Sequence, residues 1–317
     1  MRAIVVTDRA AGTAGMKLVE RPDPDAAWLA SLDGASYGDV VVEVHASAFT
    51  GNELEWPSTW VDRLGRDRTP SIPGHEVAGV VTALGYGTTG LSVGQRVFGL
   101  TDWTRDGTLA EYSVVEARNL APLPGDVDFT VGAGVAMTGL TAWQGLFDHG
   151  RLRTGQTVLV HGAAGAVGST AAQLAREAGA HVIGTGRAAA RRAALDFGAH
   201  EFVDLDNDAL EDVCGVDLVF DVLGGDIQRR SAALVRAGGT LVTVTGPPEA
   251  WPADGLAIDF VVVSDRAQLG EIAQRVRDGR LRPNIGTVAP LDDAVAAFNP
   301  AERVAGKTVI RVRPQGR

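Results

Sequence analysis

Cysteine is nearly absent from this sequence of 317 residues, which contains only Cys214. One cysteine excludes an intrachain disulfide framework and is typical of a reducing cytoplasm, which is the location we expect. The sequence also lacks a run of about eighteen or more apolar residues, so we expect no membrane span. Basic runs are absent and the net charge is −10, which argues against nucleic acid as a partner.

The first part of the chain, to about residue 120, is rich in β-branched residues, and Gly, Asp and Pro stand between its apolar runs. This pattern predicts strands joined by turns. The stretch TTGLSVGQRV resembles a turn that leads into a strand. We expect strands at residues 3–6, 39–48, 75–84, 96–100 and 109–117.

From about residue 126 the pattern changes to an alternation of strands and helices. Continuous apolar runs are typical of buried parallel strands, and strand–helix alternation indicates a doubly wound sheet. We expect a long helix at 132–147, helices that end near 178 and 197, and strands at 157–162, 181–186, 217–222, 240–246 and 260–264. The last residues predict helices near 266–278 and 292–299 and a strand at 307–312.

The stretch TVLVHGAAGAVGSTAAQLAREAGA carries the strongest functional signal. A strand ends, three glycines follow at 162, 165 and 168, and a helix begins. Apolar residues at 171, 174, 175 and 178 give this helix one buried face. Small residues let the backbone approach a pyrophosphate, and the helix N-terminus offers it free N–H groups. We therefore predict dinucleotide binding at Ala163, Gly165, Ala166, Val167 and Gly168.

The end of the next predicted strand indicates which dinucleotide binds. Sites that prefer NAD place Asp or Glu there, on the ribose 2′-hydroxyl. This chain instead has Gly186 followed by Arg187 and Arg191. Because an arginine can pair with a 2′-phosphate, the sequence favours NADPH over NADH as the cofactor. The alternative is that both arginines are solvated helix residues.

Six motifs together resemble the medium-chain dehydrogenase/reductase superfamily, in its zinc-independent quinone oxidoreductase branch, which includes ζ-crystallin. They are HASAFTGNELEW, PGHEVAGVVTALG, LSVGQRVFGL, GLTAWQGL, VLVHGAAGAVG and GKTVI. The resemblance implies an α/β fold in which a Rossmann domain, residues 126–265, is inserted into a GroES-like β-rich domain, residues 1–125 and 266–317. It also implies a homodimer formed through the Rossmann sheet edge.

The resemblance further implies that Val222, Gly246 and Val261 lie beside the nicotinamide half of the cofactor. Leu205 stands where many relatives have a tyrosine that contacts the adenine or phosphate side. That contact is expected to be absent or replaced.

His75 in PGHEVAG occupies the position of a catalytic zinc ligand in zinc-dependent members. Those members also have a cysteine near the position of Asn52 and a third ligand near residues 136–138, where this chain reads Ala-Met-Thr. The structural zinc of those members is bound by four cysteines, and this chain has only one. A catalytic zinc needs about three protein ligands, so we expect no metal, although a His45, His75 and Glu53 site stays open as an alternative.

Without a Lewis acid, a conjugated carbonyl or a quinone is an easier hydride acceptor than an unactivated ketone. Such a reaction needs hydrogen-bond donors at the substrate oxygen. The resemblance suggests Asn52 and Thr138 as catalytic residues, with a turn cap and a helix-interior threonine as the alternatives. Trp56, His75 and Trp103 are candidates for the substrate pocket, where a flat ring could stack on the indoles. Core packing of the tryptophans and a buried histidine bonded to a neighbour stay open as alternatives.

The sequence assigns no proton donor, because nothing places Tyr37, Tyr86 or Tyr112 at the site.

Taken together, the dinucleotide loop, the two arginines and the missing zinc ligands predict an NADPH-dependent reductase of quinones or α,β-unsaturated carbonyls that takes a small-molecule substrate. A zinc-dependent alcohol dehydrogenase and an NADPH-binding protein with little turnover are the alternatives.

Overall fold

The computed structural model describes residues 1–24, 37–213, 215–302 and 304–313. Cys214, the one cysteine, lies outside them. The chain forms two compact units. The first unit comprises residues 1–137, 264–277 and 285–317, and the second comprises residues 138–263 and 278–284. The chain passes from the first unit to the second after residue 137 and returns after residue 263. The domain boundaries predicted at residues 126 and 265 stay a prediction.

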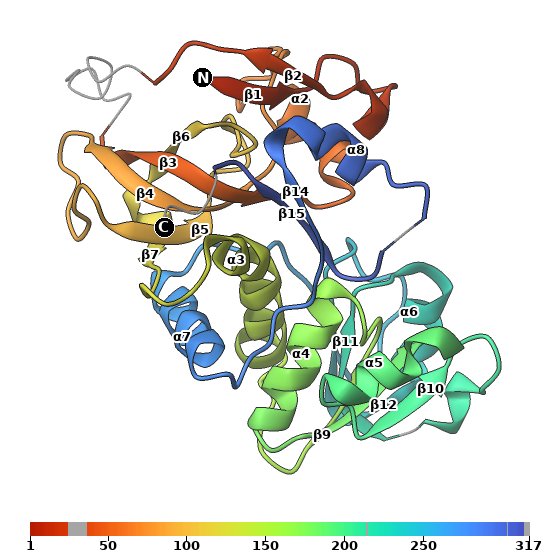
Figure 1. Ribbon diagram of the computed structural model, residues 1–317. Coiled ribbons are helices and arrows are strands. Elements are labelled where there is room, and N and C mark those ends of the chain that lie inside the picture. Colours follow the sequence, from red (N-terminus) through yellow and green to blue (C-terminus); the bar gives the residue numbers. More distant parts are fainter. Residues whose placement is uncertain (25–36, 214, 303, 314–317) are drawn as a thin grey trace. The chain divides into compact units, whose positions relative to one another are not determined.

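The first unit is built on a seven-stranded sheet with the order β14-β15-β3-β4-β5-β7, and β6 also pairs with β3 (Figure 1). Alternating burial on β6 and near-complete burial of β3 place these strands against one core. The strands are β3 (Asp39–Ala48), β4 (Glu76–Leu84), β5 (Arg96–Leu100), β6 (Tyr112–Glu116), β7 (Leu120–Pro122), β14 (Ile285–Pro290) and β15 (Lys307–Arg311).

The C-terminal strand β15 returns to this sheet, as the family resemblance implied. It pairs antiparallel with β3, with Val309 opposite Ala48, and parallel with β14 on its other side. The GroES-like domain is therefore assembled from both ends of the chain. Its remaining elements are β1 (Arg2–Val5), β2 (Lys17–Glu20), α7 (Arg266–Arg277), α8 (Ala294–Phe298) and the short helices η1 (Gly12–Gly15), η2 (Glu53–Glu55), α2 (Pro57–Trp60), η3 (Ala117–Asn119) and η8 (Leu291–Asp293).

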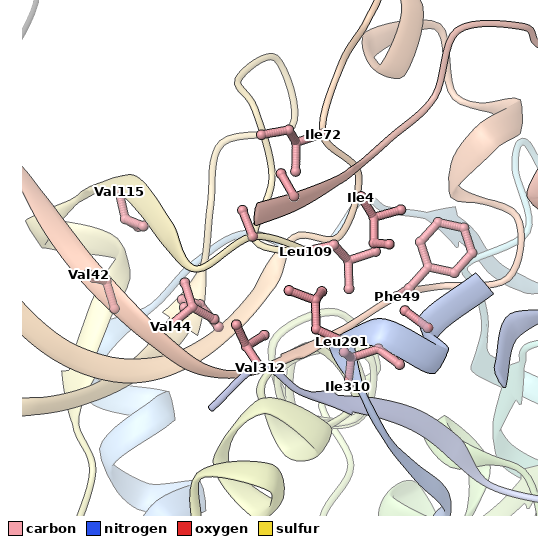
Figure 2. Close-up of a cluster of buried hydrophobic side chains, with 14 of the residues drawn as sticks. Ile4, Val42, Val44, Phe49, Ile72, Leu109, Val115, Leu291, Ile310 and Val312 are labelled. Atoms are coloured by element: carbon pink, nitrogen blue, oxygen red, sulfur yellow. The ribbon is translucent and has the colours of Figure 1, made fainter. Parts of the chain in front are cut away.

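Branched aliphatic side chains from distant parts of the sequence form the core of the first unit. Figure 2 shows Ile4 of β1, Val42 and Val44 of β3 and Ile310 of β15 converging with Leu109. All five are fully buried. Burying apolar area stabilises a fold by about 25 cal/mol per Å², so this cluster holds the two ends of the chain to β3.

The second unit is a six-stranded parallel sheet with the order β10-β9-β8-β11-β12-β13. Helix α4 (Ala166–Glu177) packs on β8 (Thr157–Val160) and β9 (His181–Gly186). This is the doubly wound fold that the strand–helix alternation predicted. The other elements are β10 (Glu201–Asp204), β11 (Val216–Asp221), β12 (Val235–Thr243), β13 (Gly255–Asp259), α5 (Arg191–Asp196), α6 (Gly225–Ser231), η5 (Ala188–Ala190), η6 (Leu210–Asp212) and η7 (Ala232–Leu234).

The long helix predicted at 132–147 is α3 (Phe129–Trp143), which continues as a π-helical turn, η4 (Gln144–His149). Among the described residues no helix is long and apolar enough to cross a membrane.

The strand predicted at 260–264 is wrong, because the last strand of the sheet is β13, at 255–259. Pairing with β12 stops at Asp259 opposite Thr243, where β12 ends. Beyond that point a side chain satisfies the backbone: Val263 N–H donates to Gln144 Oε1 at 3.1 Å, and Gln144 Nε2 donates to Val263 O at 2.8 Å. The apolar run FVVVS therefore looks like a strand in the sequence but leaves Val261 and Val263 exposed.

Candidate functional site

The glycine-rich loop of the second unit joins β8 to α4. Gly162 has a φ of +62°, a left-handed conformation that favours glycine. Gly165 is the N-cap residue of α4, and no side chain of the described residues caps this end of the helix. The first-turn N–H groups of Ala166, Val167 and Gly168 are therefore available to an anion, which the positive end of the helix favours.

Close backbone packing shows why this loop needs small residues. A Cβ placed on Gly168 would lie 2.1 Å from the carbonyl oxygen of Gly162, and one on Gly184 would lie 2.7 Å from the Cβ of Ala163. Glycine at these two positions therefore lets α4 and β9 approach the loop after β8 closely. The loop thus fits the pyrophosphate of a dinucleotide.

The two arginines predicted to bind a 2′-phosphate follow β9. Arg187 and Arg191 are both exposed. Arg191 Nη2 lies 3.3 Å from Asp208 Oδ2, and its guanidinium lies 5.1 Å from the centre of the Phe202 ring. Exposed ion pairs contribute about 0–1 kcal/mol, so Asp208 does not prevent Arg191 from pairing with a phosphate. Leu205 N–H donates to Gly186 O at 2.8 Å, which brings the Leu205 position beside the end of β9.

The remaining predicted cofactor residues follow strand ends of the same sheet. Val222 follows β11, and its Cγ2 would lie 3.1 Å from a Cβ on Gly162. Gly246 has a φ of +125°. Val261 is 75% exposed. Proteins with parallel sheets bind ligands outside the carboxyl ends of the strands, and these three positions follow such strand ends. Thr138, in contrast, is buried on α3.

A buried polar network that the sequence did not predict lies at the end of β8. His161 is fully buried between Thr185 Oγ1, 2.8 Å from its Nδ1, and Ser231 Oγ, 2.7 Å from its Nε2. Burial lowers the pKa of His161 to about 4. This histidine is therefore neutral at pH 7 and satisfied on both nitrogens, which makes it a structural part of the sheet.

In the first unit the structure brings His75 to Glu53. His75 Nδ1 lies 2.7 Å from Glu53 Oε1, and the same oxygen accepts the N–H of Gly74 at 2.5 Å. The two side chains are 2% and 0% exposed. The Nε2 atom of His75 is buried without a hydrogen-bond partner among the described residues.

Two tryptophans flank this histidine. The centre of the Trp103 ring lies 5.2 Å from that of His75, and Trp56 lies at 6.2 Å. The two indoles meet edge to face, 5.3 Å apart at 85°. Both are partly exposed, whereas Trp60 is a core residue whose Nε1 donates to Leu54 O at 2.8 Å.

Glu76, the next residue after His75, has different partners. Its carboxylate forms a buried ion pair with Lys307 of β15 and accepts the Met137 N–H at 3.0 Å. Burial raises the pKa of Glu76, and the Lys307 ammonium acts against that rise. Lys307 Nζ also lies 3.2 Å from Thr50 Oγ1. His75 and Glu76 therefore belong to two separate clusters.

These residues do not fit a catalytic zinc. Zinc in proteins is bound by thiolate, imidazole or carboxylate groups. Near the positions where zinc-dependent members have their second and third ligands, this chain has the hydroxyl of Thr50 and the thioether of Met137. His45 lies apart from the pair, 3.5 Å from Glu43 and stacked on Phe129. No group of three or more His, Cys, Asp or Glu residues is placed to hold a metal in the part of the chain that the structure describes.

Asn52 is exposed and immediately precedes the buried Glu53. It stands at the N-cap position of η2, but its side chain makes no capping hydrogen bond to the described residues there. Its amide is consequently available to a ligand.

Family models match two segments of the chain. The model for the alcohol dehydrogenase GroES-like domain matches residues 36–125, and the model for zinc-binding dehydrogenases matches residues 197–310. The two segments fall mainly in the split sheet and in the parallel sheet, so the matches describe a dehydrogenase with both domain types.

Individual similar proteins indicate the kind of dehydrogenase more closely than the family models do. The quinone oxidoreductase of Rattus norvegicus is 30% identical over 84% of this chain and 86% of its own length. The 2-methylene-furan-3-one reductase of Solanum lycopersicum is 31% identical over 87% of this chain and 72% of its own. Among solved structures, the quinone oxidoreductase from Coxiella burnetii has a TM-score of 0.87 and 25% identity, with 99% of each chain covered. A mycobacterial protein complexed with NADPH has a TM-score of 0.81 and 26% identity, covering 98% of this chain and 100% of its own.

The fold and the dinucleotide loop define an oxidoreductase that uses a nicotinamide cofactor. The chain belongs to the medium-chain dehydrogenase/reductase superfamily, in its quinone oxidoreductase branch.

Proposed function

We propose that this protein is an NADPH-dependent reductase of quinones or α,β-unsaturated carbonyls that works without zinc. The observation that carries the proposal is the N-terminus of α4, which follows a glycine-containing loop after β8 and has no side-chain cap among the described residues. The relatives support the substrate class, because one is named a quinone oxidoreductase and another a reductase of a conjugated furanone.

In this proposal the loop residues Ala163, Gly165, Ala166, Val167 and Gly168 hold the pyrophosphate through backbone N–H groups. A bound reduced nicotinamide supplies a hydride. Val222, Gly246 and Val261 line the carboxyl edge of the sheet and limit the positions that a ring can take there.

The substrate oxygen gains negative charge as it is reduced, so donors aimed at that oxygen lower the barrier. The Asn52 amide is exposed, makes no cap and can donate. Thr138 is a second candidate donor. The carbonyl of a quinone or enone is conjugated, so the charge is spread over the substrate itself, and no Lewis acid is required.

The cofactor preference is expected to depend on Arg187 and Arg191. Hydrogen bonds to charged groups contribute about 1.5–3 kcal/mol, so NADPH should bind roughly ten- to a hundredfold more tightly than NADH. Arg187→Ala combined with Arg191→Ala should remove most of that difference, as measured by calorimetric titration of each cofactor.

Arg192→Ala is the matched control. This neighbour is 95% exposed and lies 3.9 Å from Asp196 within its own helix, so its loss should leave the preference unchanged. Equal affinity of the unmodified protein for NADPH and NADH would contradict the assignment.

We also propose a homodimer formed through the edge strand β13. Among the strands that the structure describes, β13 pairs with β12 alone. Leu256 on β13 and Trp251 before it are more than half exposed. An unpaired edge with apolar side chains is a template for a second copy. Light scattering should give twice the mass of the chain, and replacement of Leu256 by Lys should give a monomer. A wild-type monomer at micromolar concentration would exclude this edge as a stable interface.

The test of the function is a screen of NADPH oxidation against quinones, enones and enoyl thioesters. Turnover with a quinone or enone supports the proposal. Turnover with simple alcohols or ketones that depends on added zinc would favour the alcohol dehydrogenase alternative, and cofactor binding without turnover would favour a binding protein. A reducing cytoplasm, proposed from the single cysteine, is compatible with the first outcome.

A further inference from the structure

We propose that His75 delivers the proton that completes the reduction, and that Glu53 orients it for this step. The inference rests on the proposed function and deepens it, because neither the cofactor loop nor Asn52 supplies a proton donor. The described tyrosines do not fill this role from their positions: Tyr37 and Tyr86 are exposed and pack on each other, and Tyr112 lies under the Arg313 guanidinium.

The geometry fixes which nitrogen of His75 carries a proton. A carboxylate only accepts hydrogen bonds, and Glu53 Oε1 accepts from both Gly74 N–H and His75 Nδ1. Nδ1 therefore holds its hydrogen toward Glu53, and Nε2 is the atom left for a ligand. A carboxylate behind a histidine holds the ring in one tautomer and one orientation.

The surroundings of Nε2 point to a substrate oxygen as its partner. Buried polar atoms in folded proteins are nearly always hydrogen-bonded, yet Nε2 has no partner among the described residues. The two partly exposed indoles of Trp56 and Trp103 flank the ring. A flat quinone or enone that replaces one indole beside His75 would place its oxygen at Nε2 while its ring stacks on the other.

The step balances with the cofactor and water. A hydride adds to the conjugated substrate, and the electron pair of the carbonyl moves onto oxygen. That oxygen takes the proton from Nε2 of the imidazolium, which becomes neutral imidazole. Water returns a proton to Nε2 after the product leaves, so the net change is one hydride and one proton added to the substrate.

The chain offers a matched control for this pair. His181 Nε2 lies 2.7 Å from Glu201 Oε1, the same separation as in the His75–Glu53 pair, but on the exposed surface of the second unit. His181→Gln should leave turnover, cofactor affinity and melting temperature unchanged. A general acid contributes typically about 100- to 10,000-fold, so His75→Gln should lower kcat within that range, with little change in NADPH affinity.

Glu53→Gln tests the positioning role. The amide oxygen can still accept from Gly74 and His75, but the negative charge is lost. We expect a smaller fall in kcat, about tenfold, with KM unchanged, and a larger solvent isotope effect on kcat. Glu53→Asp, which keeps the charge, should recover part of the lost rate.

A spectroscopic measurement separates this inference from the proposed function. Protein with isotope-labelled histidine and no cofactor is titrated with a hydroquinone, and the Nδ1 and Nε2 resonances are followed by NMR, with His75→Gln used for assignment. We expect a protonated Nδ1 throughout and a shift of the Nε2 resonance on binding. An unmoved Nε2 at saturating hydroquinone, or full kcat in His75→Gln, would overturn the role of His75. If the wild-type protein reduces no quinone or enone, the proposed function fails, while the titration still decides whether His75 contacts the ligand.

Discussion

Replacing Asn52 by Ala is expected to lower turnover about a hundred- to a thousandfold. Loss of one donor to a developing oxyanion costs about 2.7–4 kcal/mol. The residue lies in the first unit and the dinucleotide loop in the second, so NADPH affinity should hardly change. The measurement is single-turnover hydride transfer at saturating NADPH, with folding checked by melting temperature.

Asn52→Asp distinguishes the donor from a turn residue. A carboxylate only accepts hydrogen bonds, so it would face the charge that builds on the substrate oxygen, and this variant should be at least as slow as Asn52→Ala. Both Asn and Asp suit a turn, which predicts full activity if the role is conformational. Glu55→Gln, an exposed change on the same turn, serves as the control. A fully active Asn52→Asp protein would remove Asn52 from the mechanism.

Replacing Lys307 by Met is expected to lower the free energy of unfolding by about 3–5 kcal/mol, because it leaves the buried Glu76 carboxylate without its counter-charge. Burial already raises the pKa of Glu76. A carboxyl whose folded pKa lies above its unfolded value binds more protons in the folded state, so its contribution to stability falls as pH rises. The loss should therefore be larger at pH 7 than at pH 5, as measured by urea denaturation.

The double variant Glu76→Gln with Lys307→Met is the control. It removes both charges and keeps an oxygen for the Met137 N–H, so it should recover a large part of the stability. A Lys307→Met protein as stable as the wild type would show that the ion pair does not hold β15 to the sheet.

Much of the fold follows from local sequence. The strands at 39–48, 96–100 and 181–186 were predicted at the bounds that the structure shows, because β-branched runs between turn residues leave few alternatives. The dinucleotide loop was also predictable, since its glycines, its strand and its helix are contiguous.

The errors and omissions involve long-range partners. The run at 260–264 has strand composition, but its neighbour β12 has ended and Gln144, far away in the sequence, takes its hydrogen bonds. The pairing of His75 with Glu53 joins residues 22 positions apart. The sequence raised Glu53 only as a possible metal ligand, and the order of residues does not show which carboxylate a histidine will meet.

The central claim is hydride transfer from NADPH to a conjugated acceptor without zinc, and one paired measurement tests it most directly. The zinc content of the purified protein is determined by elemental analysis, and NADPH oxidation by a quinone is followed in the same sample before and after a chelator. Because the described residues offer a hydroxyl and a thioether where zinc needs thiolate, imidazole or carboxylate, we predict much less than one zinc per chain and unchanged turnover. About one zinc per chain, with turnover lost to the chelator and restored by zinc, would contradict the account.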